Sequence, residues 1–212
     1  MEAARATAAA THGPACPAYR VRAATVEDWP AVTALYAALS PHSQRMRFSR
    51  ELGGTLRAGA VARVSPGDVQ LVALRGERVV GEGRLCRVPD GGHEFALAVA
   101  DDDQRHGIGT ALLVALQVIA HRQGLSGMRG EVRFDNLPIL RMLHHVGAEL
   151  VEVLDGDLLF EVACDRVPTG PAAAPVLPRR PVEVPRATAC RATLALRSGG
   201  FTVATCLGNY ST

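Results

Sequence analysis

The stretch that decides the fold reads Gln104-Arg105-His106-Gly107-Ile108-Gly109-Thr110-Ala111. It lies between an apolar segment and a run of residues with helical periodicity. Two glycines here let the backbone turn sharply and expose successive N–H groups, and the following helix points the positive end of its dipole the same way. No proline removes a donor, and no acidic side chain interrupts the stretch. The sequence therefore predicts an anion site suited to a pyrophosphate.

Three phosphate-binding motifs compete for this stretch. The dinucleotide fingerprint G-x-G-x-x-G fails because its third glycine falls on Leu112, and the Walker loop fails because no Gly-Lys-Ser/Thr is present. The pattern Q/R-x-x-G-x-G/A fits Gln104, Gly107 and Gly109. Two glycines before a helix also occur as a plain tight turn, so the surrounding elements have to decide between these readings.

Hydrophobic periodicity predicts the order strand, helix, helix, three strands, helix, strand, helix, two strands. The expected strands cover 19–24, 69–75, 79–88, 94–100, 128–134, 149–154 and 157–164, and the expected helices cover 29–40, part of 42–56, 107–123 and 137–146. An antiparallel meander that leads into one crossover helix requires a mixed sheet. The predicted fold class is therefore α/β (α+β), with a mostly antiparallel sheet of about seven strands and about four helices.

Composition divides the 212 residues into three parts. Residues 1–18 are a low-complexity run of Ala, Thr, Gly and Pro, and residues 165–212 carry prolines at a density that opposes regular structure through Arg186. Both segments are expected to be disordered tails. Residues 19–164 are expected to form the one folded domain.

The charge balance excludes several function classes. A formal net charge of +2 gives no electrostatic case for nucleic acid, and the sequence has neither a membrane-spanning apolar run nor the h-region of a secretory signal. We therefore expect a cytoplasmic protein. All 23 basic residues are arginines, so an enzyme that acetylates lysines could not modify its own side chains.

No metal site is expected. The five cysteines are odd in number and share no short spacing, which favours neither a disulfide framework nor zinc. The run Asp101-Asp102-Asp103 is read as a solvated charge run, because consecutive loop residues rarely converge on one ion.

The motif and the element order together resemble the GNAT superfamily of N-acetyltransferases. A second family signature is Asn136, followed eleven residues later by Gly147. The resemblance implies a GNAT fold that binds acetyl-CoA and transfers acetyl to a primary amine by direct attack in a ternary complex. It also implies a set of cofactor-binding residues: Leu97, Ala98, Val99, Gln104, Arg105, His106, Gly107, Ile108, Gly109, Thr110 and Asn136. The resemblance implies that the backbone of residues 97–99 lies along the pantetheine and donates the hydrogen bond to the oxyanion. Asn136 is also compatible with a second role, as the cap of the following helix.

Glu94 is the candidate general base, acting through a water, because a carboxylate among apolar neighbours on a central strand can have a raised pKa. The alternatives are a Glu that faces solvent or one that pairs with Arg84. Many family members place a tyrosine, as general acid, seven residues after the motif Asn. Here that position is Leu143, so the tyrosine acid of those family members is missing.

Within the superfamily, two segments resemble the bacterial protein lysine acetyltransferases that modify acyl-CoA synthetases. They are Leu39–Phe48 and His93–Leu97. This resemblance favours a protein lysine as the acceptor. The alternatives are a small amine or antibiotic, or a non-catalytic module that binds acetyl-CoA and works as a sensor or scaffold. The oligomeric state is left open.

Overall fold

The computed structural model describes residues 19–48, 58–59, 62, 64–65, 67–89 and 91–165. The predicted N-terminal extension and the predicted C-terminal tail, apart from Asp165, lie outside this part of the chain, as does residue range 49–56 of the second predicted helix. Seven strands and four α-helices make up the described residues, as predicted. Their bounds are β1 Arg20–Ala23, α1 Trp29–Ala38, α2 Pro41–Phe48, β2 Val69–Arg75, β3 Arg78–Arg87, β4 His93–Val99, α4 Ile108–Arg122, β5 Gly127–Arg133, α5 Leu137–His145, β6 Glu149–Leu154 and β7 Asp157–Ala163.

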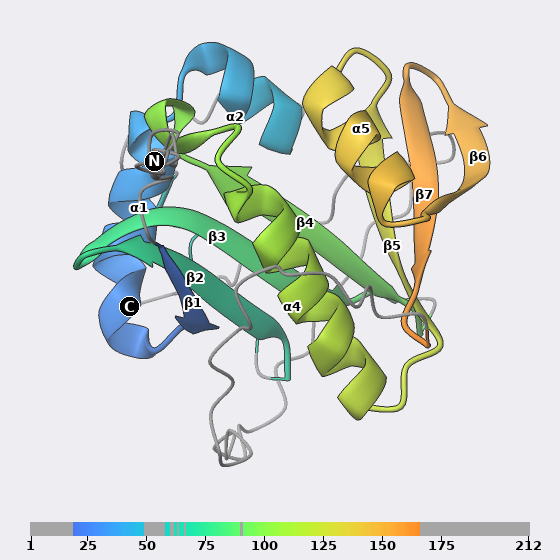
Figure 1. Ribbon diagram of the computed structural model, residues 1–212, viewed down its shortest axis with the longest axis horizontal. Helices are drawn as coiled ribbons and strands as arrows, with labels where there is room; N and C mark the ends of the chain where they lie inside the picture. Colours follow the sequence, from blue (N-terminus) through green and yellow to red (C-terminus); the bar gives the residue numbers. More distant parts are fainter. Residues whose placement is uncertain are drawn as a thin grey trace, which may run out of the picture.

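The seven strands form one sheet in the order β1-β2-β3-β4-β5-β7-β6 (Figure 1). Every neighbouring pair is antiparallel except β4 and β5, which run parallel. The crossover between these two strands is α4, because parallel neighbours cannot be joined by a tight turn. The mixed sheet predicted from the element order is confirmed.

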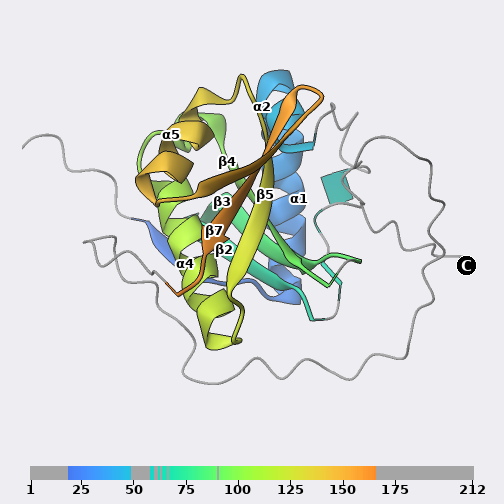
Figure 2. The same ribbon diagram turned by 90° about the vertical axis from the view of Figure 1, so that its right-hand side faces the viewer.

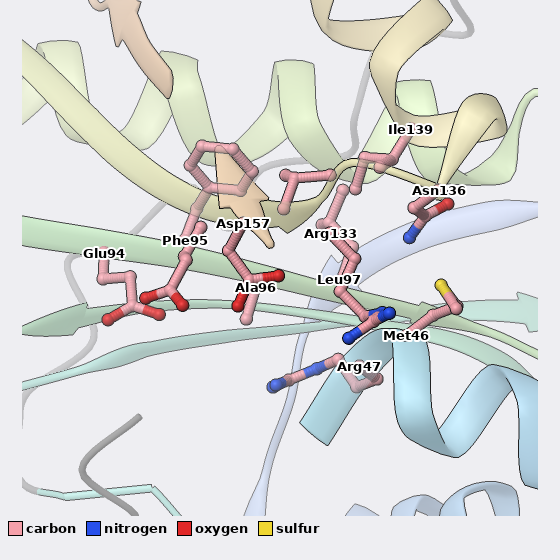
Figure 3. Close-up of a pocket in the computed structure, with 12 residues that line it drawn as sticks. Met46, Arg47, Glu94, Phe95, Ala96, Leu97, Arg133, Asn136, Ile139 and Asp157 are labelled. Carbon is pink, nitrogen blue, oxygen red and sulfur yellow. The ribbon is translucent and has the colours of Figure 1, made fainter. Parts of the chain in front are cut away.

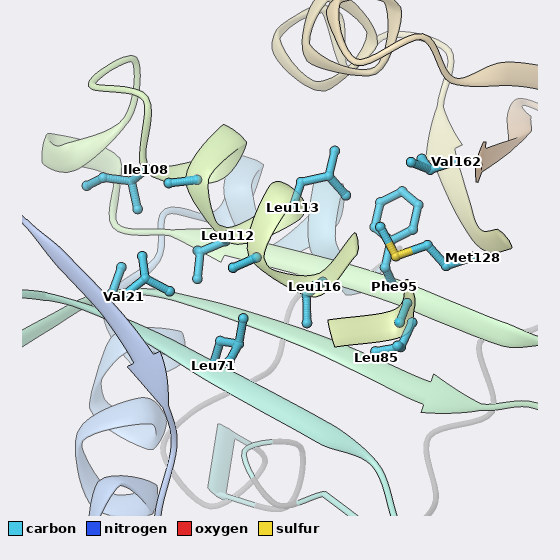
Figure 4. Packing of buried hydrophobic residues seen from close by; sticks show 14 of the residues in the cluster. Val21, Leu71, Leu85, Phe95, Ile108, Leu112, Leu113, Leu116, Met128 and Val162 are labelled. Carbon is cyan, nitrogen blue, oxygen red and sulfur yellow. The ribbon is translucent and has the colours of Figure 1, made fainter. Parts of the chain in front are cut away.

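The helices cover both faces of the sheet (Figure 2). Side chains of α4 and α5 join the larger core cluster on one face, and side chains of α1 join a second cluster on the opposite face. In the larger cluster, residues of α4 pack against residues of β1, β2, β3, β4 and β5 (Figure 4). On α4, Leu112, Leu113, Leu116 and Ala120 are buried and Ile119 is partly buried, so one apolar stripe of the helix faces the sheet.

Glycines on the sheet allow close packing near its centre. A Cβ added at Gly81 would lie 3.0 Å from Ile108 Cγ2, so this glycine lets the start of α4 approach β3 closely. A Cβ at Gly130 would lie 2.3 Å from Phe95 Cζ, so the Phe95 ring of β4 lies directly on the backbone of β5. These two contacts position α4 and hold β4 against β5.

Candidate acetyl-transfer site

The glycine-containing turn has the geometry of an anion site. Arg105 and Gly107 both adopt the left-handed conformation, with φ of 62° and 81°, and Gly107 precedes the first residue of α4. Since no side chain caps this helix end, the N–H groups of Ile108, Gly109 and Thr110 have no intrahelical partner. Ala111 donates the first helical hydrogen bond, to the Gly107 carbonyl, at 3.0 Å. The turn therefore presents adjacent N–H donors at the positive end of a 15-residue helix.

The acidic run before the turn differs from its prediction. Asp103 is fully buried and pairs with Arg75 and Arg78, the latter at 2.8 Å. Asp101 accepts hydrogen bonds from the backbone N–H and hydroxyl of Ser40, at 2.8 and 3.0 Å, and from the Ser43 hydroxyl. The prediction of a solvated charge run was wrong for Asp103, because the folded sheet brings arginines of β2 and β3 to it. Asp101 is exposed, as predicted, although the residues around the start of α2 donate hydrogen bonds to it. The negative charge of these two residues is therefore neutralised or hydrogen-bonded beside the anion site.

The Gln104 side chain ties this loop to the rest of the site. Its Nε2 donates to Ser43 Oγ and to the Val99 carbonyl, both at 3.2 Å. The amide thus joins the end of β4 to α2, and the backbone of the loop is left to face an anion. The side chain of Ile108 is buried in the core, so only its N–H can contribute to such a site.

Strands β4 and β5 diverge beside the turn. Glu94 and Arg129 are the one β4–β5 register pair among the described residues, whereas β4 pairs with β3 along its whole length, from His93 to Val99. The segment 96–99 of β4 therefore has one edge without a strand partner. Leu97 and Val99 pack toward the larger cluster and Ala98 toward the other, so the backbone of this segment borders the opening.

A pocket lies where the two strands diverge. Figure 3 shows the carboxylates of Glu94 and Asp157 directed into it, with Arg47 of α2 nearby and Asn136 toward the end away from Glu94. The lining comprises Met46, Arg47, Glu94, Phe95, Ala96, Leu97, Glu131, Val132, Arg133, Asn136, Ile139 and Asp157. Strand β4, with Glu94, Ala96 and Leu97, thus meets Asn136 and α2 at one opening.

Glu94 has the environment of a general base. Burial raises the pKa of its carboxyl above the ordinary value, and the positive charge of Arg47 opposes this shift. The alternative of a pair with Arg84 was wrong: the Arg84 guanidinium contacts Glu82 at 2.9 Å instead. In the register of the sheet Glu94 faces Cys86, and Arg84 faces Ala96, which places the arginine two pairs further along.

Comparison with known families agrees with this geometry. A family model described as the acetyltransferase (GNAT) family matches residues 25–148, which include the turn and most of the pocket. The chain belongs to the GNAT acetyltransferase family. It is therefore an acyltransferase.

Solved structures with the same fold extend the comparison to nearly the whole described chain. This GNAT acetyltransferase is similar to the GNAT domain of PAT from S. lividans, at 23% identity and a TM-score of 0.62, over 68% of this chain and 90% of that one. It is similar to yncA from Salmonella typhimurium, solved with acetyl-CoA, at 22% identity and a TM-score of 0.57, over 73% of this chain and 98% of that one. It is also similar to a spermidine N-acetyltransferase from Vibrio cholerae, solved with CoA and spermine, at 12% identity and a TM-score of 0.58, over 70% of this chain and 97% of that one.

The environment around Asn136 agrees with a role in the site and excludes an acid at position 143. Asn136 directly precedes α5 and lines the pocket, but its side chain makes no capping hydrogen bond, so the reading as a side-chain cap is not supported.

Leu143 is fully buried in the larger core cluster. A side chain on that face of α5 packs in the core, which explains why the acetyltransferase has an apolar residue there.

Two acids of the pocket escaped the sequence analysis. Glu131 lies on β5 and Asp157 opens β7, and both line the pocket with Glu94. Burial, a hydrogen bond with Asp157 and the negative charges of Asp157 and Glu94 raise the pKa of Glu131 to about 7. The one sequence signal for Glu131 is its place among Arg129 and Arg133 in an alternating strand, where these three residues share a polar face.

A buried ionic network lies between α1 and the sheet. Glu82 is fully buried and accepts hydrogen bonds from the Tyr36 hydroxyl at 2.7 Å, from Gln70 Nε2 at 2.9 Å and from Arg84 Nε at 2.9 Å. Arg84 also donates to the Tyr36 hydroxyl at 2.9 Å. This network joins α1, β2 and β3 on the sheet face that also presents Glu94, and no motif in the sequence predicts it.

Within the described residues, no group of three or more His, Cys, Asp or Glu side chains is arranged to hold a metal ion. None of the helices described is both long and apolar enough to span a membrane.

Proposed function

We propose that this acetyltransferase moves the acetyl group of acetyl-CoA to a primary amine, and that the amine is a lysine side chain of a protein. The observation that carries the proposal is the opening between β4 and β5, with N–H donors of α4 beside it and the Glu94 carboxylate inside it. We further propose that residues 19–164 form the domain that carries out this reaction, and that it acts in the cytoplasm.

The proposed cofactor site uses the residues around the glycine turn. The backbone N–H groups of Arg105, His106, Gly107, Ile108, Gly109 and Thr110 would bind the pyrophosphate, with Gln104 holding the loop in place. The unpaired edge of Leu97, Ala98 and Val99 would lie along the pantetheine and donate an N–H to the thioester oxygen. Asn136 would contact the pantetheine from the α5 side. The left-handed backbone and the neutralised Asp103 support this assignment.

The proposed chemistry uses Glu94 as the base. Glu94 would accept a proton from the acceptor ammonium through a water, and the neutral amine would attack the thioester carbonyl. The C–N bond forms and the C–S bond breaks, and the CoA thiolate takes the remaining amine proton. With Leu143 in the core, we propose that the thiolate leaves without a tyrosine acid.

Two observations bear on the acceptor. Phe134 and Leu137 are large apolar residues that are 58% and 57% exposed, and each directly follows a pocket-lining residue in the chain. An apolar rim around a polar pocket suits a protein surface better than a small polar amine. The likeness of two segments to protein lysine acetyltransferases points to the same acceptor. A small amine is the second candidate, because the acidic pocket would also bind a polyamine cation.

The direct test is acetyl transfer in a mixture of acceptors. The purified protein is incubated with radiolabelled acetyl-CoA, a cell extract and a pool of small amines, and macromolecules are then separated from small molecules. Because the chain contains no lysine, label on its own side chains adds little background. We expect label in extract proteins. Label confined to small molecules would support the second candidate, and binding of acetyl-CoA without transfer would support a non-catalytic module.

Gly107→Glu is expected to weaken acetyl-CoA binding by roughly 10- to 1000-fold, because it places a carboxylate at the proposed pyrophosphate site and strains a backbone at φ 81°. Isothermal titration calorimetry with acetyl-CoA measures the effect. Gly91→Glu is the matched control, since Gly91 has a φ of 87° and lies in the β3–β4 turn with open space around it. Affinity within about twofold of the wild type in Gly107→Glu would place the cofactor elsewhere.

A Phe134→Ser, Leu137→Ser double variant is expected to raise KM for the acceptor protein about tenfold, since it removes apolar contact area at the rim. KM for a free lysine analogue should stay unchanged, because the pocket itself is intact. Val26→Ser is the control, since Val26 is 60% exposed and lies before α1. If the double variant and the Val26→Ser control have the same KM for the acceptor protein, the acceptor does not dock at Phe134 and Leu137.

A further inference from the structure

The pocket is lined by two carboxyl groups from neighbouring strands, Glu131 of β5 and Asp157 of β7. Glu131 alternates along β5 with Met128, Gly130 and Val132, whose positions face the core, so its side chain lies on the opposite face of the sheet. Asp157 is paired in register with Arg133 across β5 and β7, two residues further along the strand. Both side chains line the pocket, and burial together with Asp157 raises the pKa of Glu131. Two neighbouring carboxyl groups are stable together when they hold one proton between them, because their repulsion without it would be large.

Two arginines, Arg47 and Arg133, line the same pocket, and the charge of Asp157 acts on Arg133. Arg133 contacts Asp135 at 3.1 Å, and the Arg47 guanidinium lies 4.7 Å from the centre of the Phe48 ring, where its charge acts on Glu94. Asp157 Oδ1 is buried, and no amide, guanidinium or hydroxyl donor among the described residues reaches it. The pocket thus has three carboxyl groups, from β4, β5 and β7, and an excess of negative charge when all three are ionised.

We propose that Glu131 and Asp157 bind the ammonium group of the acceptor, which takes the place of the proton that the two carboxyl groups share in the free protein. This inference rests on the proposed function, because it names the groups that hold the amine at the same site. An ammonium has three donors, which suits Glu131, Asp157 and the water that leads to Glu94. Since these side chains lie on the sheet face opposite α4, the amine would enter from the side away from the glycine turn.

The proton balance of this step is explicit. When the ammonium binds, the Glu131–Asp157 proton passes to solvent, and both carboxylates contact the charged nitrogen. Glu94 then accepts one proton from that nitrogen, and the neutral amine attacks the thioester. Glu131 and Asp157 remain ionised during the attack, so their part is to bind and position the amine.

Proton release on amine binding tests the inference without catalysis. The probe is Nα-acetyl-lysine methylamide, whose one charge is its ε-ammonium, added to the full chain in weak buffer near pH 7 with a pH indicator. At this pH about half of the Glu131 carboxyls hold a proton, since burial and Asp157 raise the pKa of Glu131 to about 7. We expect the wild type to release protons. Glu131→Gln and Asp157→Asn should release none, and Glu152→Gln, which alters an exposed acid of β6, should behave as the wild type.

Kinetics separate binding from a structural role. Glu131→Gln and Asp157→Asn are each expected to raise the acceptor KM roughly 10- to 100-fold, with kcat within about threefold and unchanged affinity for acetyl-CoA. As the pH falls through about 7, the shared proton competes with the ammonium, so the wild-type KM should rise. Asp157→Asn removes one cause of the raised pKa of Glu131, and the rise in KM should therefore move to lower pH.

The two proposals fail in different ways. Acetyl transfer with unchanged acceptor KM and pH profile in both variants would overturn the inference and leave the proposed function standing. An absence of proton release from the wild type with a probe that it acetylates would overturn it as well. Proton release by the wild type without transfer to any amine would instead contradict the proposed function, and would support the Glu131–Asp157 pair as an ammonium site.

Discussion

A Glu94→Gln variant is expected to lose roughly 10²- to 10⁴-fold in kcat while binding acetyl-CoA as tightly as the wild type. The amide keeps the size of the side chain and its position on β4, but it cannot accept the proton of the acceptor. The measurement is kcat at saturating acceptor, with the acceptor that the labelling experiment identifies. The matched control is again Glu152→Gln, which removes an exposed carboxylate outside the pocket and should leave kcat unchanged.

The pH dependence of kcat gives this prediction a second readout. Burial raises the pKa of Glu94 and the charge of Arg47 lowers it, so the Arg47→Gln substitution should raise that pKa further. Because the base has to be ionised to accept a proton, the acid limb of the kcat profile should move to higher pH in this variant. Saturating acceptor keeps the effect apart from that of Glu131 on KM. Unchanged kcat in Glu94→Gln would show that another group removes the proton.

A Glu82→Leu variant is expected to lower the free energy of unfolding by about 3–5 kcal/mol. Burial opposes the ionisation of Glu82, yet Arg84, Arg47 and the donors of Gln70 and Tyr36 outweigh it and hold the pKa of Glu82 below its ordinary value. Leucine would leave the buried Arg84 guanidinium without its carboxylate and the Tyr36 hydroxyl without its acceptor. A decrease of this size is a large fraction of the free energy of unfolding of an ordinary domain.

Urea unfolding followed by circular dichroism measures the free energy of unfolding of the Glu82→Leu variant. Glu77→Gln is the matched control, because it breaks an ion pair with Arg20 whose side chains are 93% and 58% exposed, and it should cost less than about 1 kcal/mol. Tyr36→Phe should fall between the two, since Glu82 keeps the hydrogen bonds of Gln70 and Arg84. Equal stability of Glu82→Leu and Glu77→Gln would mean that the buried network contributes little.

The order of the elements and their approximate bounds could be read from the sequence. Helix α4 extends over 108–122 where 107–123 was predicted, and α5 over 137–145 where 137–146 was predicted. These elements are decided by local features: periodicity within one helix, the glycine at each end, and proline in the first turn of α5. The split between α1 and α2 at Pro41 was predicted for the same reason.

Charged residues were the hardest to interpret from the sequence. Asp103 and its neighbours look like a solvated run, and Glu82 looks like an ordinary polar residue of a strand. Both are buried because arginines offset the cost of desolvation: Arg75 of β2 and Arg78 of β3 for Asp103, and Arg84, two residues along β3, for Glu82. A pattern along the chain does not show this, since Asp103 meets its arginines, and Glu82 meets Tyr36 and Gln70, only when the sheet and α1 pack together.

The sequence by itself determined the local parts of this protein: the left-handed glycine turn, the helix whose N–H groups it exposes, and the succession of strands and helices. The tertiary structure alone decided where β4 and β5 part after the Glu94–Arg129 pair, and which acids meet at that opening. Glu94, Glu131 and Asp157 are far apart in the chain and have no common motif. They meet because a parallel crossover and an antiparallel hairpin place β4, β5 and β7 side by side, and such long-range pairing is set by the packing of the whole sheet.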